Sequence, residues 1–162
     1  DAADRRWNMK KKKICFASSS GGHYEQLMML KPLMEKYDSF IVTEKTAYRA
    51  VGPGRKTYYL HQVNRKERLF PLRMAANTLK AVGIILRERP DAVISTGVLA
   101  TIPLCLLIKA AGGKLIYIES FAKVKSATET GKLMYKFADQ FYVQWETMKE
   151  VYPAALYLGG IY

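Results

Sequence analysis

The stretch Ile14-Cys-Phe-Ala-Ser-Ser-Ser-Gly-Gly-His23 decides the fold of this chain. Residues 14–17 are apolar and predict a buried strand, which the serines and glycines after it bring to an end. Helical spacing then begins, with Leu27, Leu30 and Met34 near one face. The sequence therefore predicts a strand, a glycine turn and a helix in succession.

A turn of this kind suits a phosphate or diphosphate group. The first amides of a helix have no backbone partner and carry the positive end of its dipole, and glycine lets an anion approach them. We expect Ser20, Gly21 and Gly22 to form such a site, with the imidazole of His23 at its lip. A tight turn with a solvated His23 is the alternative that the loop alone leaves open. The loop is neither a Walker loop nor a full dinucleotide fingerprint.

Strands and helices alternate along the rest of the chain. This alternation predicts an α/β fold with a Rossmann-like parallel sheet and helices on both faces. Residues 1–8 read as an expression remnant ahead of Met9, and residues 9–162 as a single domain. The predicted strands are 13–17, 39–43, 57–62, 91–95, 115–118, 140–144 and 155–158, and the predicted helices are about 24–36, 72–89, 98–111, 130–138 and 146–151.

Polar residues follow four of these strands. In open parallel sheets, ligands bind beyond the carboxyl ends of the strands. Loops are polar in any protein, but four such segments at one edge favour a ligand cleft. The segments are 18–23, Thr43-Glu44, Ser95-Thr96-Gly97 and Glu119-Ser120.

The composition points to a negatively charged partner. The chain has 26 Lys and Arg residues against 14 Asp and Glu, a net charge of +12, which suits nucleic acid, anionic lipid or a phosphorylated substrate. No nucleic-acid recognition motif is present, so a nucleic-acid partner is not expected.

The two cysteines, Cys15 and Cys105, are expected to be buried free thiols. Neither fits a metal-ligand spacing, and we expect no metal and no cofactor.

One segment mixes cations with large apolar residues and predicts contact with an anionic membrane surface. It consists of Arg65, Lys66, Arg68, Leu69, Phe70 and Arg73. For most of residues 75–86 we expect an ordinary helix with its apolar side in the core and its basic side solvated. A strand, a turn and a core helix explain the apolar segment 92–111 better than a membrane span does.

Several longer segments carry a resemblance to a known family. They are Pro90-Asp-Ala-Val-Ile-Ser-Thr-Gly97, Leu115-Ile-Tyr-Ile-Glu-Ser-Phe-Ala122 and Tyr142-Val-Gln-Trp-Glu146, together with Ser20-Gly-Gly-His23. With them the chain resembles the Alg14 family and its bacterial capsule and exopolysaccharide relatives over about residues 9–162.

The resemblance implies the acceptor-side, N-terminal half of a GT-B glycosyltransferase of the MurG type. A separate Alg13-like chain would supply the nucleotide-sugar half, and the acceptor would be a lipid-diphosphate sugar. The chain would sit peripherally on the cytoplasmic face of the membrane. Eukaryotic members carry an N-terminal membrane helix that is not seen here, which favours a UDP-sugar transferase of bacterial polysaccharide assembly over a dolichol enzyme.

The resemblance also implies roles for single residues. The loop from Ser20 to Gly22 would cradle the diphosphate, and His23 would act as general base or orienter near the acceptor hydroxyl. Glu119 would be catalytic or would cap the loop 121–125, and these two alternatives remain open. The other expected acceptor or diphosphate contacts are Thr96, Gly97 and Ser120. A non-catalytic scaffold for the partner and a small stand-alone transferase are the rival functions.

Overall fold

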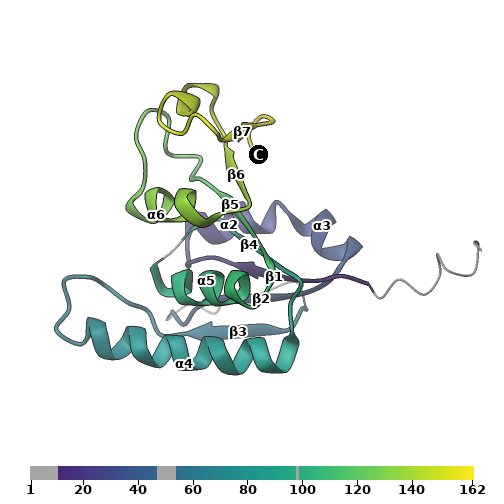
Figure 1. The fold of residues 1–162 in the computed structure, drawn as a ribbon, viewed down its shortest axis with the longest axis vertical. Coiled ribbons are helices and arrows are strands. Elements are labelled where there is room, and N and C mark those ends of the chain that lie inside the picture. Colours follow the sequence, from purple (N-terminus) through teal and green to yellow (C-terminus); the bar gives the residue numbers. More distant parts are fainter. Residues whose placement is uncertain (1–10, 47–53, 98) are drawn as a thin grey trace, which may run out of the picture.

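The computed structural model describes residues 11–46, 54–97 and 99–162, so the predicted remnant 1–8 lies outside it. Seven strands form one sheet in the order β3-β2-β1-β4-β5-β6-β7, and all neighbouring strands are parallel. Figure 1 shows helices on both sides of this sheet, which confirms the expected α/β class. The strands are β1 (Lys13–Ala17), β2 (Asp38–Glu44), β3 (Thr57–Leu60), β4 (Ala92–Ser95), β5 (Lys114–Ile118), β6 (Gln140–Val143) and β7 (Leu156–Tyr157).

The helices follow the predicted alternation, with two breaks. Pro32 and Pro103 each lie in the first turn of a helix, where the missing N–H of proline costs nothing. The predicted helix 24–36 is therefore two helices, and the predicted helix 98–111 starts later, after a short 3-10 turn. The helices are α2 (Gly22–Met28), α3 (Lys31–Lys36), α4 (Phe70–Glu88), α5 (Ile102–Ala110) and α6 (Glu129–Phe137), with 3-10 turns η1 (Leu99–Thr101) and η2 (Glu146–Glu150).

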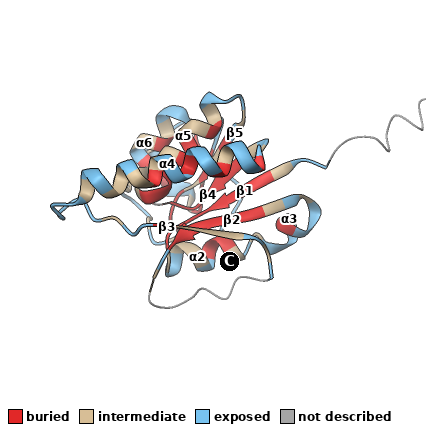
Figure 2. Ribbon diagram, turned by 90° about the horizontal axis from the view of Figure 1, so that it is seen from below, coloured by how far each residue is buried: buried red, intermediate tan, exposed pale blue. Residues whose placement is uncertain are grey.

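The central strand β1 is buried on both faces (Figure 2). Ile14 and Phe16 pack into the core beneath α2 and α3, whereas Cys15 and Ala17 pack into the larger core on the opposite face. A strand covered on both faces has no polar side, which is why the run is continuously apolar. Cys15 and Cys105 are buried and free, as the sequence predicted.

Helix α4 follows the prediction for residues 75–86 only in part. Its buried residues are Asn77, Ala81, Ile84 and Glu88, and Ala81 and Ile84 belong to the core as expected. The side chains of Leu79 and Leu86 are instead 75% and 70% exposed, so the expectation was wrong for these two leucines. Polar contacts explain the orientation. The amide of Asn77 accepts from the backbone N–H and donates to the backbone carbonyl of His61, both at 2.8 Å.

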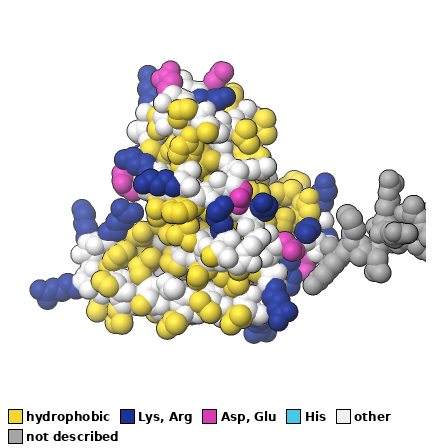
Figure 3. Space-filling model, viewed as in Figure 1, with side chains coloured by type: hydrophobic (Ala, Val, Ile, Leu, Met, Phe, Trp, Pro, Cys, Tyr) yellow, Lys and Arg dark blue, Asp and Glu magenta, His cyan; other side chains and the backbone are white. Residues whose placement is uncertain are grey.

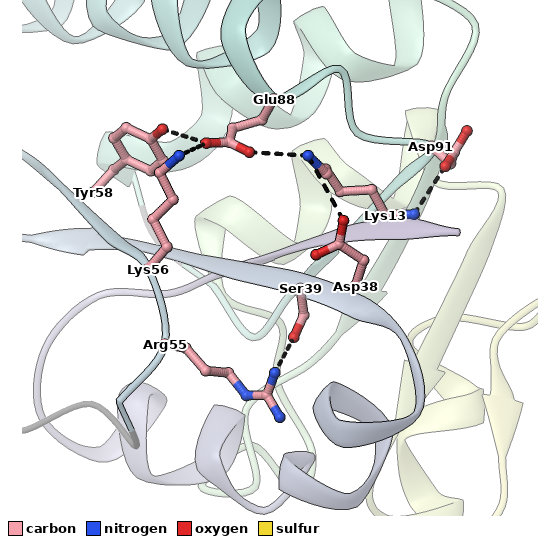
Figure 4. A network of polar contacts seen from close by, with 8 residues as sticks. All are labelled: Lys13, Asp38, Ser39, Arg55, Lys56, Tyr58, Glu88 and Asp91. Atoms are coloured by element: carbon pink, nitrogen blue, oxygen red, sulfur yellow. Dashed lines mark hydrogen bonds and ion pairs between the residues drawn. The ribbon is translucent and has the colours of Figure 1, made fainter. Parts of the chain in front are cut away.

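A charged network joins the end of α4 to the amino ends of the strands (Figure 4). The Glu88 carboxylate accepts hydrogen bonds from Lys13 Nζ at 3.2 Å, from Lys56 and from the Tyr58 hydroxyl. Burial alone would raise the pKa of Glu88, but the hydrogen bonds from Lys56, Tyr58 and Lys13 outweigh it and lower the pKa to about 2. The network therefore stabilises the fold only while Glu88 is ionised.

We expect Glu88→Gln to remove an acid-sensitive part of the stability. In the folded chain Glu88 has a pKa of about 2, against an ordinary value of 4.5. Its contribution is complete above about pH 4.5 and is lost as the pH falls towards 2. Because water reaches this network, we expect a loss of roughly 1–2 kcal/mol at pH 7. Urea unfolding between pH 3 and 7 measures it.

The exposed Glu35 of α3 offers a matched charge change. Glu35→Gln should leave the slope of stability against pH nearly unchanged, whereas Glu88→Gln should flatten it below about pH 4.5. Equal pH profiles for wild type and Glu88→Gln would contradict the role given to this carboxylate.

Candidate active site

The strand order brings together the two loops that the sequence singled out. β1 neighbours β4, so the loops at their carboxyl ends flank the point where the strand order reverses, the usual ligand position in such sheets. The Thr96 hydroxyl donates to the carbonyl of His23 at 2.7 Å, and His23 Nδ1 lies 2.9 Å from the carbonyl of Thr96. The Ser19 amide donates to the carbonyl of Gly97 at 3.1 Å. The predicted site residues of both loops therefore lie in one place.

The glycine turn presents backbone amides to the solvent. Gly21 is the N-cap of α2 with φ +75°, a conformation that favours glycine, and its carbonyl accepts from the amides of Tyr24 and Glu25. Within the described parts of the chain, the amides of Gly22 and His23 have no backbone acceptor. Both glycines are exposed, and a Cβ on Gly22 would meet nothing within 4 Å. An anion can therefore reach these amides, whereas Ser20 is half-buried beside them.

The contact with Thr96 decides which nitrogen of His23 carries a proton. A carbonyl oxygen only accepts hydrogen bonds, so Nδ1 of His23 must be the donor. In the neutral imidazole, Nε2 is then left as the unprotonated nitrogen, which can accept a proton from a hydroxyl. The contact with the loop after β4 thus leaves Nε2 of the neutral ring as the nitrogen that can accept a hydrogen bond.

Gly97 allows two ring side chains to lie against the backbone. Its φ is +117°, and a Cβ there would lie 3.2 Å from the hydroxyl of Tyr117 and 3.4 Å from Nδ1 of His23. Burial raises the pKa of Tyr117, so its hydroxyl stays neutral next to this loop. Sequence reasoning missed Tyr117 because an aromatic residue in an apolar strand reads as core.

Glu119 is held by residues on either side of the loop 121–125, and its hydrogen-bond partners within the described ranges do not include residues of that loop. Its side chain is 1% exposed, and both carboxylate oxygens are occupied. They accept from the Ser120 amide (2.9 Å), the Thr128 amide (3.2 Å), the Thr128 hydroxyl (2.9 Å) and the Tyr152 hydroxyl (2.7 Å). Burial, and then Glu119 itself, raise the pKa of Tyr152. Glu119 therefore holds the loop from β5 to α6 in place.

A buried pair of glutamines connects this loop to the glycine-turn helix, and sequence reasoning missed both. Gln144 Nε2 donates to Gln26 Oε1 at 2.8 Å and to the carbonyl of Glu119 at 2.9 Å. The Phe121 amide also donates to Gln26 Oε1. These contacts place Ser120, itself 6% exposed, at the same edge of the sheet as His23. No local sequence signal pairs residues that lie 118 positions apart.

The predicted membrane segment, residues 65–73, consists of the loop before α4 and the first turn of that helix. Exposed apolar residues then continue along α4. Leu69 is 53% exposed and Leu72 is 68% exposed, whereas Phe70 is half-buried. Figure 3 shows hydrophobic side chains along the lower edge of the molecule, where Figure 1 places α4. The exposed apolar row of α4 comprises Leu72, Leu79, Val82 and Leu86. Arg65, Lys66 and Arg68 are exposed beside it, and Arg73 pairs with Glu67 at 2.6 Å.

No helix in the described ranges combines the length and apolarity that a membrane crossing needs.

Comparison with solved structures defines the class of fold. Acinetobacter baumannii MurG superposes with a TM-score of 0.73 at 15% identity, covering 92% of this chain and 45% of MurG. A UDP-N-acetylglucosamine 2-epimerase from Rickettsia bellii superposes with a TM-score of 0.72 at 12% identity, covering 94% of this chain and 46% of the epimerase. The chain has the Rossmann-like half-domain fold of GT-B proteins.

The sequence profile described as Oligosaccharide biosynthesis protein Alg14 like matches residues 14–161, and the chain belongs to this family. The UDP-N-acetylglucosamine transferase subunit ALG14 of rat is 34% identical over 116 residues, which cover 64% of this chain and 54% of the rat protein. The human subunit is 32% identical over 117 residues, with the same two coverages. The Yarrowia lipolytica subunit is 26% identical and covers 91% of this chain and 80% of its own length. The chain thus spans about half the length of the mammalian relatives.

Gly131→Ala should destabilise the chain because the position of its Cβ is already occupied. A Cβ there would lie 2.0 Å from Glu119 Oε2 and 2.7 Å from both the Thr128 and Tyr152 hydroxyl oxygens. The buried carboxylate would have to move away from its donors. We expect a loss of about 2–4 kcal/mol in the free energy of unfolding, measured by urea denaturation.

The exposed Gly83 in α4 is the matched control, since a Cβ there would meet nothing within 4 Å. Gly83→Ala should stabilise the chain by roughly 0.5–1 kcal/mol, because alanine is the better helix former. A neutral Gly131→Ala would contradict the packing described around Glu119.

Proposed function

We propose that this chain is the acceptor-binding, membrane-docking subunit of a two-component UDP-sugar glycosyltransferase that acts on a lipid-diphosphate-linked sugar. The observation that carries the proposal is the reciprocal pair of hydrogen bonds between His23 and Thr96. It sets an oriented base beside exposed amides that suit a diphosphate. Family membership and the names of the relatives as transferase subunits support the same reaction class.

His23 is the base of this proposal. Transfer to a sugar hydroxyl requires the loss of its proton as the new bond forms, and Nε2 of His23 accepts that proton. The amides of Gly22 and His23 hold the diphosphate, with Ser20 and Gly21 shaping the turn, and Thr96 and Gly97 fix the imidazole. Glu119 and Ser120 act through the loop that they hold rather than on the substrate.

The partner of this proposal is an Alg13-like chain that binds the UDP-sugar. The chain matches 45% of MurG, and the rat and human relatives carry the word subunit in their names. A half-domain with an acceptor site needs a nucleotide-sugar site facing it. The two rival functions make different predictions. A non-catalytic scaffold would not need His23 for sugar transfer, and a stand-alone transferase would not need the partner.

We place the chain peripherally on the cytoplasmic face of a membrane, through the basic segment from Arg65 to Arg73 and the apolar row of α4. Cations around exposed leucines are typical of surfaces that lie in the interface of an anionic bilayer. The role in bacterial polysaccharide assembly stays a prediction from the sequence, since the curated relatives described above are from rat, human and a yeast.

The function is tested by sugar transfer to a lipid-diphosphate sugar with the chain and an Alg13-like partner reconstituted together. We expect no robust turnover from the chain alone and restored turnover with the partner. His23→Ala should lower turnover of the pair roughly 10²–10⁴-fold, because the proton acceptor is removed. Gly22→Val should abolish transfer, because its side chain would keep the diphosphate away from the backbone amides. The fold should survive, because nothing lies within 4 Å of the Cβ position.

The controls separate the rivals. Glu35→Gln, at an exposed position of α3 on the other face of the sheet from α4, should leave transfer unchanged. Normal kinetics for a folded, partner-bound His23→Ala chain would favour the scaffold, and full turnover by the chain alone would favour the stand-alone enzyme.

Membrane docking is tested by sedimentation with phosphatidylglycerol-containing vesicles. Leu79→Ser and Leu86→Ser should each weaken binding roughly tenfold, because burying an exposed leucine contributes about 1.5–3 kcal/mol. Changing Arg65, Lys66, Arg68 and Arg73 to Ser should release the protein, and salt should weaken the wild type. Leu158, 83% exposed on the C-terminal segment, is the control, and Leu158→Ser should bind normally. Equal effects at all three leucines would rule out α4 as the docking face.

A further inference from the structure

A hollow in the surface lies between the end of β3 and the start of α4. Figure 1 shows the loop that joins these elements extending beyond the strand. The hollow has a volume of about 540 Å³, within the range of small-molecule sites. It is lined by Gln62, Val63, Asn64, Arg65, Lys66, Glu67, Arg73 and Leu99.

The charges of this hollow suit a single phosphate group. Three cations, Arg65, Lys66 and Arg73, face one acid, Glu67. Glu67 pairs with Arg73 at 2.6 Å, so Arg65 and Lys66 leave an excess of two positive charges. The nearby Glu129 is within electrostatic reach of Arg65, but it pairs with Lys132 at 2.9 Å. Guanidinium groups match phosphate oxygens in geometry as well as in charge.

The surroundings of the hollow indicate where the phosphate comes from. Leu69 and Leu72, both more than half exposed, lie directly between the basic loop and the rest of α4. Leu79 and Leu86 follow at intervals of seven residues, two helical turns, and so continue on the same face. An amphipathic helix that lies in a membrane interface buries such a face at the boundary between headgroups and acyl chains. A basic hollow at the end of that helix then lies at the level of the headgroups.

We propose that this hollow seats the phosphate of one anionic phospholipid and so fixes the position of the chain on the membrane. The proposal rests on the membrane docking of the proposed function and adds a stoichiometric headgroup site to it. Glu67 competes with the phosphate for Arg73, because the guanidinium that now pairs with the carboxylate also lines the hollow. The exposed position of this ion pair makes the exchange inexpensive.

The competition gives a test in which a single substitution strengthens binding. Glu67→Gln frees Arg73 and should tighten binding to phosphatidylcholine vesicles containing phosphatidylglycerol by roughly fivefold. Arg65→Gln with Lys66→Gln should weaken it by tenfold or more. The matched controls lie on α3, which packs on the other face of the sheet. Glu35→Gln, and Lys31→Gln with Lys36→Gln, make the same charge changes at exposed positions and should shift binding by less than twofold.

A soluble probe distinguishes a headgroup site from general attraction. Short-chain phosphatidylglycerol below its micellar concentration should bind one molecule per chain in calorimetry, and Arg65→Gln with Lys66→Gln should abolish that binding. The double variant leaves the ion pair of Glu67 with Arg73 intact. Its result therefore tests the site even if Glu67→Gln disturbs the loop.

The outcomes separate this inference from the proposed function. Equal shifts at α3 and at the hollow would show diffuse charge only, which overturns the headgroup site and leaves membrane docking in place. Loss of vesicle binding in the leucine variants of α4 without any effect at the hollow would do the same. Binding of inorganic diphosphate or RNA at the hollow, with no binding of short-chain phosphatidylglycerol, would also overturn it. Absence of any vesicle binding by the wild type would remove both.

Discussion

The candidate site depends on two hydrogen bonds between His23 and Thr96, which join the loops after β1 and β4. Those loops meet because β1 lies in the middle of the sheet and has β4, not its sequence neighbour, on one side. The hydrogen bond to Nδ1 fixes the tautomer of the imidazole, and the backbone of Gly97 leaves room for its ring. One topological feature therefore determines the position, the orientation and the tautomer of His23.

The two ionisable residues that the sequence proposed as catalytic have different physical situations. His23 is half-buried and has one nitrogen committed to the protein. Glu119 is buried, and both its oxygens accept hydrogen bonds from neighbouring donors. A carboxylate satisfied in this way stabilises the loop that it holds, and moving it would leave those donors unpaired. Gly131 makes room for this carboxylate, because a side chain there would overlap with Glu119 Oε2.

The sequence predicted the sheet well because its inner strands are covered on both faces and are therefore continuously apolar. It predicted the glycine turn because Gly21 and Gly22 interrupt such a strand. It misjudged α4 because hydrophobicity alone does not say which side of a helix faces the core. There Asn77 faces inward because it binds the backbone of His61, directly after β3, and Glu88 does so because it binds Tyr58 of β3 and Lys13 of β1. These partners come from distant parts of the chain. The contact of Gln26 with Gln144 could not be predicted from the sequence for the same reason.

The fold alone does not choose a reaction, since both a glycosyltransferase and an epimerase share it at low identity. The proposed function adds a requirement that the fold does not contain, since an enzyme with a lipid-linked acceptor must bring its site to the bilayer. The exposed leucines of α4 support that proposal. The loop between β3 and α4 and the turn at His23 both follow carboxyl ends of strands in the same parallel sheet. The proposed docking through that loop and α4 would therefore hold the candidate site near the headgroups, where the diphosphate of the proposed acceptor would lie.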